Sequence, residues 1–355
     1  MREVAAAVGV SASTVSRALK NDPSISEATR ERVRRAVERL GYRPDADFAR
    51  MMSQYRRREQ RRATACIGFI DLWPSDRGSG HPAEENEVYF AAAGERAGEL
   101  GYRLERFRLA EDALSAERLE KVLSARNIRG LLFPPIPDDP DAVGRLRLDW
   151  SRYASAAIGY SLHHVRMSRS ATHHYRDIWT ALRRLTDAGY RRIGLALGPT
   201  HDKRVDHFWM AGFLAYQRFI PEACRVPLLL AAAAHLRFDE VESWFQRNRP
   251  DVVVSAQYCM EDWLSAMGFR VPGDVGVVQL AVKRGDLRHT GIRQSSDAIA
   301  VAAIDRVIAQ LHLNEQGLPR HPQTTLVESD WAEGRTARGG TAKPGAAGLV
   351  DLAWI

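Results

Sequence analysis

The stretch VGVSASTVSRAL, residues 8–19, decides how the first part of this 355-residue chain folds. Gly9 is the residue type that most often ends a helix, and Ser11 is a side chain that caps the start of the next one. Apolar residues recur at helical spacing on both sides of this turn, namely Val4, Ala5, Val8, Val15, Ala18 and Leu19. Two short helices joined by a tight turn predict a helix-turn-helix.

The outward face of the second helix is small and polar, and it carries Ala12, Ser13, Ser16 and Arg17. Small side chains allow a helix to lie deep in the major groove of DNA, where an arginine bonds a guanine edge through two N–H groups. This face therefore indicates contact with duplex DNA, with Arg17 as a base reader.

A third helix is predicted to begin at Ser26 and to end at Gly41, with Pro44 preventing its continuation. Its apolar residues follow i, i+3, i+4, i+7 spacing, at Val33, Ala36, Val37 and Leu40. Its opposite face carries arginines that suit phosphates better than bases, at positions 30, 34 and 35.

The positive charge of the chain is concentrated at its N-terminal end. Residues 1–62 hold fifteen Arg or Lys and eight Asp or Glu, a net charge of +7 that equals the net charge of the whole chain. The remaining residues are therefore balanced. Such an asymmetry indicates a polyanionic partner for the N-terminal segment alone.

Residues 3–45, EVAAAVGVSASTVSRALKNDPSISEATRERVRRAVERLGYRPD, resemble the DNA-binding headpiece of the lactose-repressor (LacI/GalR) family of bacterial transcription regulators. The elements VS-x-STVSR-x-L and T-R-x-R-V…LGYRP carry the resemblance. It implies base contacts from Ala12, Ser13 and Arg17. It implies phosphate contacts from Thr14, Ser16, Ser26 and Thr29.

The resemblance also implies a hinge helix after YRP, which inserts an apolar side chain into the minor groove at the centre of the operator. The segment DFARMMSQYRRR, residues 47–58, occupies this place, with Ala49 and Met52 as the minor-groove residues. A plain linker with buried methionines is the alternative interpretation.

Strands and helices alternate after residue 63. Buried strands are expected at ACIGFIDLW (65–73), IRGLLF (128–133), ASAAIGY (154–160), YRRIGLAL (190–197), PDVVVSA (250–256) and VGVVQLA (275–281). This alternation predicts parallel sheets with helices on both faces, and the number of units favours two lobes.

This body resembles the regulatory domain of the same family, whose fold is similar to periplasmic sugar-binding proteins, through the markers LGY (100–102), GYRRIGL (189–195) and MAGF (210–213). The expected fold is thus an all-α headpiece followed by a two-lobed α/β domain. The expected divisions are a headpiece at 1–44, a hinge and basic linker at 45–62, lobe one at 63–161 and 291–318, lobe two at 162–290 and 319–335, and a disordered Gly/Ala-rich tail at 336–355.

A small-molecule effector is expected between the lobes, at the carboxyl ends of the strands. In sugar- or purine-binding members of the family an arginine and an aspartate grip the ligand. Trp209 stands at the position of the arginine, and Ala281 or Val282 stands at that of the aspartate. The candidate substitutes near strand ends are Asp71, Trp73, Tyr160, Arg204, Trp209, Tyr258 and Lys283. Each is alternatively a core or surface residue, and stacking by the two tryptophans would favour a carbohydrate.

The segment SDAIAVAAIDRVIAQLHLN, residues 296–314, predicts a helix with one apolar side. In the family such helices form the dimer interface, and packing in the core is equally compatible with this pattern. We expect a homodimer that binds a pseudo-palindromic operator.

These observations favour a ligand-responsive transcriptional regulator that acts as a repressor. We expect no enzymatic activity and no cofactor. The alternative is a nucleotide-cofactor enzyme on a doubly wound α/β fold, because GSGHPA (78–83) satisfies G-x-G-x-x-A, although Pro82 interrupts the turn that binds pyrophosphate. A periplasmic receptor is opposed by the absence of an export signal, which predicts a cytoplasmic protein.

Metal and membrane sites are not expected. The three cysteines lack zinc or disulfide spacing, and the adjacent histidine pairs, such as His173–His174, are expected at the surface. No apolar run is long enough to span a membrane.

Overall fold

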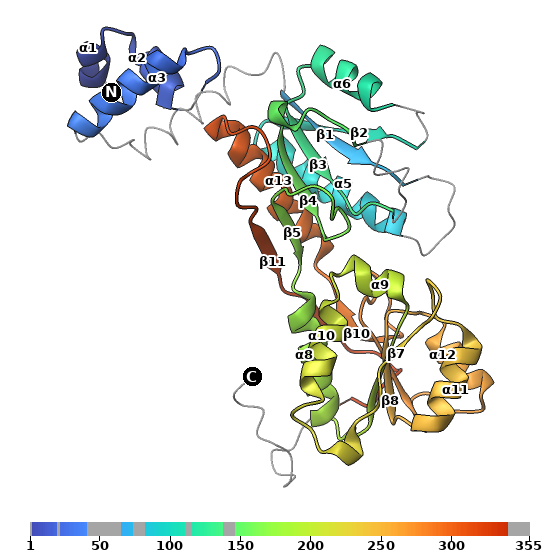
Figure 1. The fold of residues 1–355 in the computed structure, drawn as a ribbon. Coiled ribbons are helices and arrows are strands. Elements are labelled where there is room, and N and C mark those ends of the chain that lie inside the picture. The colour runs from blue at the N-terminus through green and yellow to red at the C-terminus, as the bar shows by residue number, and fades with distance from the viewer. Residues whose placement is uncertain are drawn as a thin grey trace. The chain divides into compact units, whose positions relative to one another are not determined.

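The computed structural model describes residues 2–19, 22–40, 65–73, 82–110, 115–137 and 146–339 (Figure 1). The chain divides into two compact units, of which unit 1 comprises the described residues within 1–158, 162–170 and 300–325. Unit 2 comprises those within 159–161, 171–299 and 326–355. Within the described residues, no helix combines the length and the apolar character needed to cross a membrane.

The headpiece consists of three helices, α1 (Arg2–Val8), α2 (Ala12–Leu19) and α3 (Glu27–Leu40). They share a core of small and branched side chains, comprising Val4, Ala5, Val8, Val15, Ala18, Ile25, Val33 and Ala36. Gly9 has a φ of +71°, a left-handed conformation that glycine adopts without strain. After it, the amide of Val10 donates to the carbonyl of Ala5 at 3.0 Å, which closes the end of α1. The predicted helix-turn-helix is confirmed.

Unit 1 contains a six-stranded sheet in the order β11-β5-β4-β3-β1-β2. Its strands are β1 (Ala65–Asp71), β2 (Tyr102–Arg108), β3 (Gly130–Phe133), β4 (Ala154–Ile158), β5 (Arg169–Thr172) and β11 (Thr324–Val327). The pairings of β1 to β5 along this order are parallel. Its helices are α5 (Pro82–Glu99), α6 (Ala116–Ala125) and α13 (Ser296–Leu313, of which residues 300–313 lie in unit 1), with a 3-10 turn η2 (Trp150–Arg152).

Helices cover both faces of this sheet because side chains alternate along each strand. Leu131 of β3 packs in a buried cluster with Leu119 and Leu123 of α6. A Cβ at the preceding residue, Gly130, would lie 2.9 Å from the side chain of Leu311 on α13. Glycine at 130 therefore allows α13 to pack closely against the face opposite α6.

Unit 2 contains a second six-stranded sheet in the order β12-β10-β9-β8-β6-β7. Its strands are β6 (Ile193–Leu197), β7 (Leu229–Leu230), β8 (Val252–Ser255), β9 (Gly276–Gln279), β10 (Thr290–Arg293) and β12 (Asp330–Ala332). The pairings are parallel except that of β10 with β12. Its helices are α8 (His174–Asp187), α9 (Pro199–Arg204), α10 (Phe208–Tyr216), α11 (Phe238–Asn248) and α12 (Met260–Ala266), with a 3-10 turn η3 (Glu222–Cys224).

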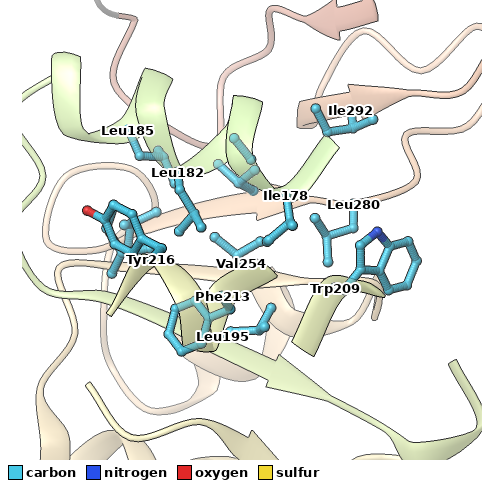
Figure 2. Close-up of a cluster of buried hydrophobic side chains, with 14 of the residues drawn as sticks. Ile178, Leu182, Leu185, Leu195, Trp209, Phe213, Tyr216, Val254, Leu280 and Ile292 are labelled. Atoms are coloured by element: carbon cyan, nitrogen blue, oxygen red, sulfur yellow. The ribbon is translucent and has the colours of Figure 1, made fainter. Parts of the chain in front are cut away.

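The sheet of unit 2 is also covered on both faces. Helices α8 and α10 pack Ile178, Leu182 and Phe213 over Val254 of β8 (Figure 2). The adjacent residue of β8, Val253, packs in a separate cluster with residues of α11 and α12. The two mostly parallel sheets confirm the expected two-lobed α/β fold.

The units divide at different residues from those we expected. Residues 162–170, expected in lobe two, lie in unit 1, where Arg169 and Ser170 of β5 pair with β4. Residues 291–299, expected in lobe one, lie in unit 2, because β10 pairs with β9. Residues 319–325, also expected in lobe two, lie in unit 1, where β11 adjoins β5. Hydrogen bonding between strands, rather than the position of the strands in the chain, decides these boundaries.

The expected disordered tail does not begin at residue 336. Thr336 and Ala337 are buried, and the Thr336 hydroxyl donates to the carbonyl of Val277 at 2.8 Å. The same hydroxyl accepts from the amide of Thr290 at 2.9 Å. Residues 336–339 therefore belong to unit 2, and residues 340–355 lie outside the described part of the chain.

Candidate nucleic-acid interface

Two helices of the headpiece begin with the same hydroxyl cap. Ser11 Oγ accepts from the amide of Thr14 at 3.1 Å and lies 2.8 Å from Thr14 Oγ1. Ser26 Oγ accepts from the amide of Thr29 at 3.4 Å and lies 2.9 Å from Thr29 Oγ1. The amides at a helix N-terminus and the hydroxyls beside them suit a phosphate oxygen. Three of the expected phosphate ligands thus lie at helix starts.

Arg17 lies in the last turn of α2, and its side chain is 52% exposed. Its Nε donates to Asp22 Oδ2 at 3.0 Å, and its Nη2 donates to Ser24 Oγ. Hydrogen bonds from Ser24, with Arg17 alongside, lower the pKa of Asp22 to about 2. The carboxylate is therefore ionised at neutral pH, and the expected base reader is held in a defined place. No pattern in the sequence indicated either partner of Arg17.

The other expected DNA contacts are placed only in part. Ala12, Ser13 and Ser16 lie on α2, as expected. The expected minor-groove residues, Ala49 and Met52, lie outside the described residues.

The arginines of α3 are engaged within the headpiece. Arg30 donates to the carbonyl of Ile25 at 3.0 Å, and Arg35 contacts Glu31 at 3.3 Å. Arg34 lies 3.3 Å from the same glutamate. The Glu31 carboxylate offsets part of the positive charge that the sequence places on this helix. Arg32, which the sequence analysis did not single out, donates to the carbonyl of Val8 at 2.5 Å and so ties α3 to the end of α1.

Asp71 and Trp73, two of the expected effector contacts, lie together after β1. Asp71 Oδ1 accepts from the amide of Trp73 at 3.1 Å and from Asn86 Nδ2 at 3.0 Å. Burial raises the pKa of Asp71. The indole of Trp73 donates to the carbonyl of Pro135 at 2.7 Å. These contacts give both side chains a structural role at the carboxyl end of the strand.

The rings of Tyr160 and Trp209 both lie near that of His174 in unit 2. The ring centroids of His174 and Trp209 are 5.3 Å apart, and those of Tyr160 and His174 are 6.2 Å apart. Trp209 is 3% exposed and belongs to the core cluster drawn in Figure 2. Core packing is therefore the role that its contacts explain, and stacking on a sugar stays a prediction.

A buried polar pair lies beside these rings. His174 Nδ1 is 3.8 Å from Asp177 Oδ2, which accepts a hydrogen bond from Ser329 Oγ at 3.1 Å. Burial lowers the pKa of His174 to about 3 and raises that of Asp177 to about 7, so the uncharged forms of both are favoured. The expectation that His174 lies at the surface is wrong, because α8 turns this residue into the interior.

Tyr258 and Lys283 also lie together. The hydroxyl of Tyr258 accepts from the amide of Lys283 at 2.6 Å, and Lys283 Nζ lies 5.0 Å from the centre of the ring. Burial raises the pKa of Tyr258 to about 12. The ring also packs on His289, whose Nδ1 is 2.7 Å from Asp286. Arg204, the remaining expected effector contact, ends α9.

No cluster of three His, Cys, Asp or Glu side chains suitable for a metal occurs among the residues placed in the structure. Of the segment GSGHPA, only Pro82 and Ala83 are described. They begin α5, where proline is favoured in the first turn.

Comparison with known proteins bears on the headpiece first. The model of the lacI family of bacterial regulatory proteins matches residues 1–45. The HTH-type transcriptional regulator MalR of Streptococcus pneumoniae is 42% identical over 55 residues, which are 16% of this chain and 17% of MalR. An uncharacterized HTH-type transcriptional regulator of Streptomyces limosus is 28% identical over 205 residues, 56% of this chain and 52% of that protein. The matches thus span at most about half the length of these relatives.

Solved structures extend the likeness beyond the headpiece. The complex of the transcriptional regulator CelR with cellobiose has a TM-score of 0.57 and 20% identity, covering 94% of this chain and 98% of CelR. The lac repressor dimer bound to operator and an anti-inducer has a TM-score of 0.54 and 18% identity, covering 94% and 97%. Residues 1–45 of this chain match a lacI-family headpiece. For this chain the solved structures establish the fold of the larger domain, and the sequence match establishes the headpiece.

Proposed function

We propose that this chain is a lacI-family, ligand-responsive, sequence-specific DNA-binding transcriptional regulator, a repressor that binds a pseudo-palindromic operator as a dimer. The observation that carries the proposal is the helix-turn-helix with Arg17 exposed at the end of α2. A recognition helix of this kind lies in the major groove, and a two-fold dimer presents two such helices to two half-sites.

The contacts of the headpiece divide into two groups under this proposal. Ala12, Ser13 and Arg17 read bases, and the hydroxyls of Thr14, Ser16, Ser26 and Thr29 bind phosphates. We further propose that residues 45–62 form the hinge, with Ala49 and Met52 in the minor groove. The cluster of positive charge in residues 1–62 supports this assignment. A cytoplasmic location, where bacterial DNA lies, follows from the proposal.

A small molecule is the proposed effector, and carbohydrates are the first class to test. Related structures of this fold hold cellobiose, glucose and sucrose. In this chain, Tyr258 and Lys283 support such a role in unit 2, because the Tyr258 hydroxyl accepts from the Lys283 amide and Lys283 Nζ lies 5.0 Å from the centre of the Tyr258 ring. The matched proteins are transcription regulators, and nothing in them favours a nucleotide-cofactor enzyme.

The test begins with selection of bound fragments from random duplex DNA, repeated with a panel of sugars. Arg17→Ala is then compared with the unaltered chain on the selected duplex and on its single-base variants. We expect a loss of about 1–3 kcal/mol that is confined to one base pair in each half-site. Arg35→Ala, a control on α3, is expected to weaken binding to all duplexes alike. Equal losses for Arg17→Ala on selected and random DNA would contradict the base-reading role.

A further inference from the structure

The guanidinium of Arg17 is engaged along one of its two hydrogen-bonding edges. Nε donates to Asp22 Oδ2 at 3.0 Å, and Nη2 donates to Ser24 Oγ. Nε and Nη2 form the side-on edge of the planar group. The end-on edge, with one N–H on Nη1 and one on Nη2, points away from this pair. Two parallel N–H groups on one edge match O6 and N7 of guanine.

Asp22 is itself firmly placed. Its amide donates to the carbonyl of Arg17 at 3.0 Å, which fixes its backbone against the end of α2. Its Oδ1 accepts from the amide of Ser24 at 2.9 Å and from the Ser24 hydroxyl at 2.5 Å. Pro23, between these two residues, limits the backbone further because its ring fixes φ. The carboxylate is therefore a rigid support for the arginine that it contacts.

A carboxylate in this place has two opposite effects on DNA binding. It holds a long side chain in one orientation before DNA arrives, which reduces the entropy lost when a base is bound. It also sets a negative charge beside the duplex, which weakens attraction to phosphates of any sequence. Both effects favour binding to one base sequence over binding to DNA of any sequence.

We propose that Asp22, supported by Ser24, positions the end-on edge of Arg17 for a guanine and restrains this arginine from binding phosphates. This inference rests on the proposed function of the chain as a sequence-specific DNA-binding regulator. Asp22 is here a positioning residue, which acts on the base through Arg17. It determines specificity without touching the base.

The test uses the full chain with Asp22→Asn, which removes the charge and keeps the size of the side chain. Glu31→Gln is the matched control, because it removes the same charge from α3, where Glu31 contacts Arg34 and Arg35 rather than Arg17. Dissociation constants are measured for the selected duplex and for the duplex with the guanine at the Arg17 position replaced. The position itself is identified by Arg17→Ala.

Discrimination is the dissociation constant for the duplex with the guanine replaced divided by that for the selected duplex. We expect Asp22→Asn to reduce this ratio by roughly 3- to 10-fold, which is a part of the discrimination that a bidentate arginine supplies. Glu31→Gln is expected to strengthen binding to both duplexes by a common factor and to leave the ratio unchanged. Ser24→Ala, which leaves the Asp22 charge in place, is expected to reduce the ratio less. It keeps the test decisive if Asp22→Asn does not fold.

A second readout needs no DNA. The Nε–H signal of Arg17 in the NMR spectrum is expected to exchange slowly with water, to exchange faster in Asp22→Asn and to be unchanged in Glu31→Gln. An unaltered ratio and an unaltered exchange rate in Asp22→Asn would overturn this inference while the proposed function stands. Absence of any preferred duplex for the unaltered chain would overturn the proposed function, and this inference with it.

Discussion

Replacement of Gln310 by alanine tests how α13 is fastened to the sheet of unit 1. Gln310 is buried, and its side-chain amide bonds both backbone groups of Ser155 in β4. Oε1 accepts from the Ser155 amide at 3.2 Å, and Nε2 donates to the Ser155 carbonyl at 3.1 Å. The neighbouring strand β5 pairs with β4 at Ala157 and Ile158, beyond this point. The Gln310 side chain therefore bonds the backbone groups of β4 that β5 does not pair with.

The variant leaves one buried N–H and one buried C=O of Ser155 without a partner. Each such group costs about 1–3 kcal/mol, so we expect a loss of roughly 2–5 kcal/mol in the free energy of unfolding. The small cavity left by the shortened side chain acts in the same direction.

Urea unfolding followed by circular dichroism measures this loss. Gln246→Ala is the matched control, because this glutamine is exposed on α11, and its loss is expected to stay within about 0.5 kcal/mol. A loss for Gln310→Ala no greater than that of the control would refute the reasoning. The side-chain amide of Gln310 would then contribute no more to the free energy of unfolding than that of the exposed Gln246.

Two further changes test the interior of unit 2. Because burial raises the pKa of Asp177 from 3.8 to about 7, the folded state keeps a proton there that the unfolded state releases, so the contribution of Asp177 to stability is expected to fall as the pH rises from about 4 to 7. His174, whose pKa burial lowers from 6.5 to about 3, contributes the opposite slope. Asp177→Asn is therefore expected to give a more positive slope of stability against pH than the unaltered chain in urea unfolding at a series of pH values, and equal slopes would show that the carboxyl does not titrate as described. Gly194→Ala would place a Cβ 2.5 Å from the ring of Trp244 and is expected to cost about 1–3 kcal/mol by overpacking. Thermal unfolding beside Gly98→Ala, where nothing lies within 4 Å of the added Cβ, checks this, and similar melting temperatures would contradict it.

The headpiece was predictable because its signals are local. Gly9 and Ser11 mark the turn, and the apolar residues of each helix recur within a few positions. The parallel sheets were predictable for a similar reason, since buried strands appear as short apolar runs between helices. What these patterns predict is the kind of element and its order along the chain.

The partners of side chains were not predictable in the same way. Asp22 contacts Arg17 although five positions separate them in the sequence. Asp177 accepts a hydrogen bond from Ser329, which is 152 positions away in the sequence. Trp209 illustrates the same limit, because a tryptophan near a strand end has the same sequence pattern whether it packs in the core or binds a ligand. In these cases tertiary contacts determine the partner of each side chain, and the spacing of residues in the sequence does not predict it.

The contributions of residues 300–338 to both units imply an order of events during synthesis. Unit 1 needs α13 and β11, and unit 2 needs β12 and the strand contacts of Thr336. Neither sheet is complete until this late part of the chain has left the ribosome, whereas the three helices of the headpiece use residues 2–40 alone. Domains generally fold as units during translation. We therefore expect the headpiece to fold first and the two larger units to complete folding at nearly the same time.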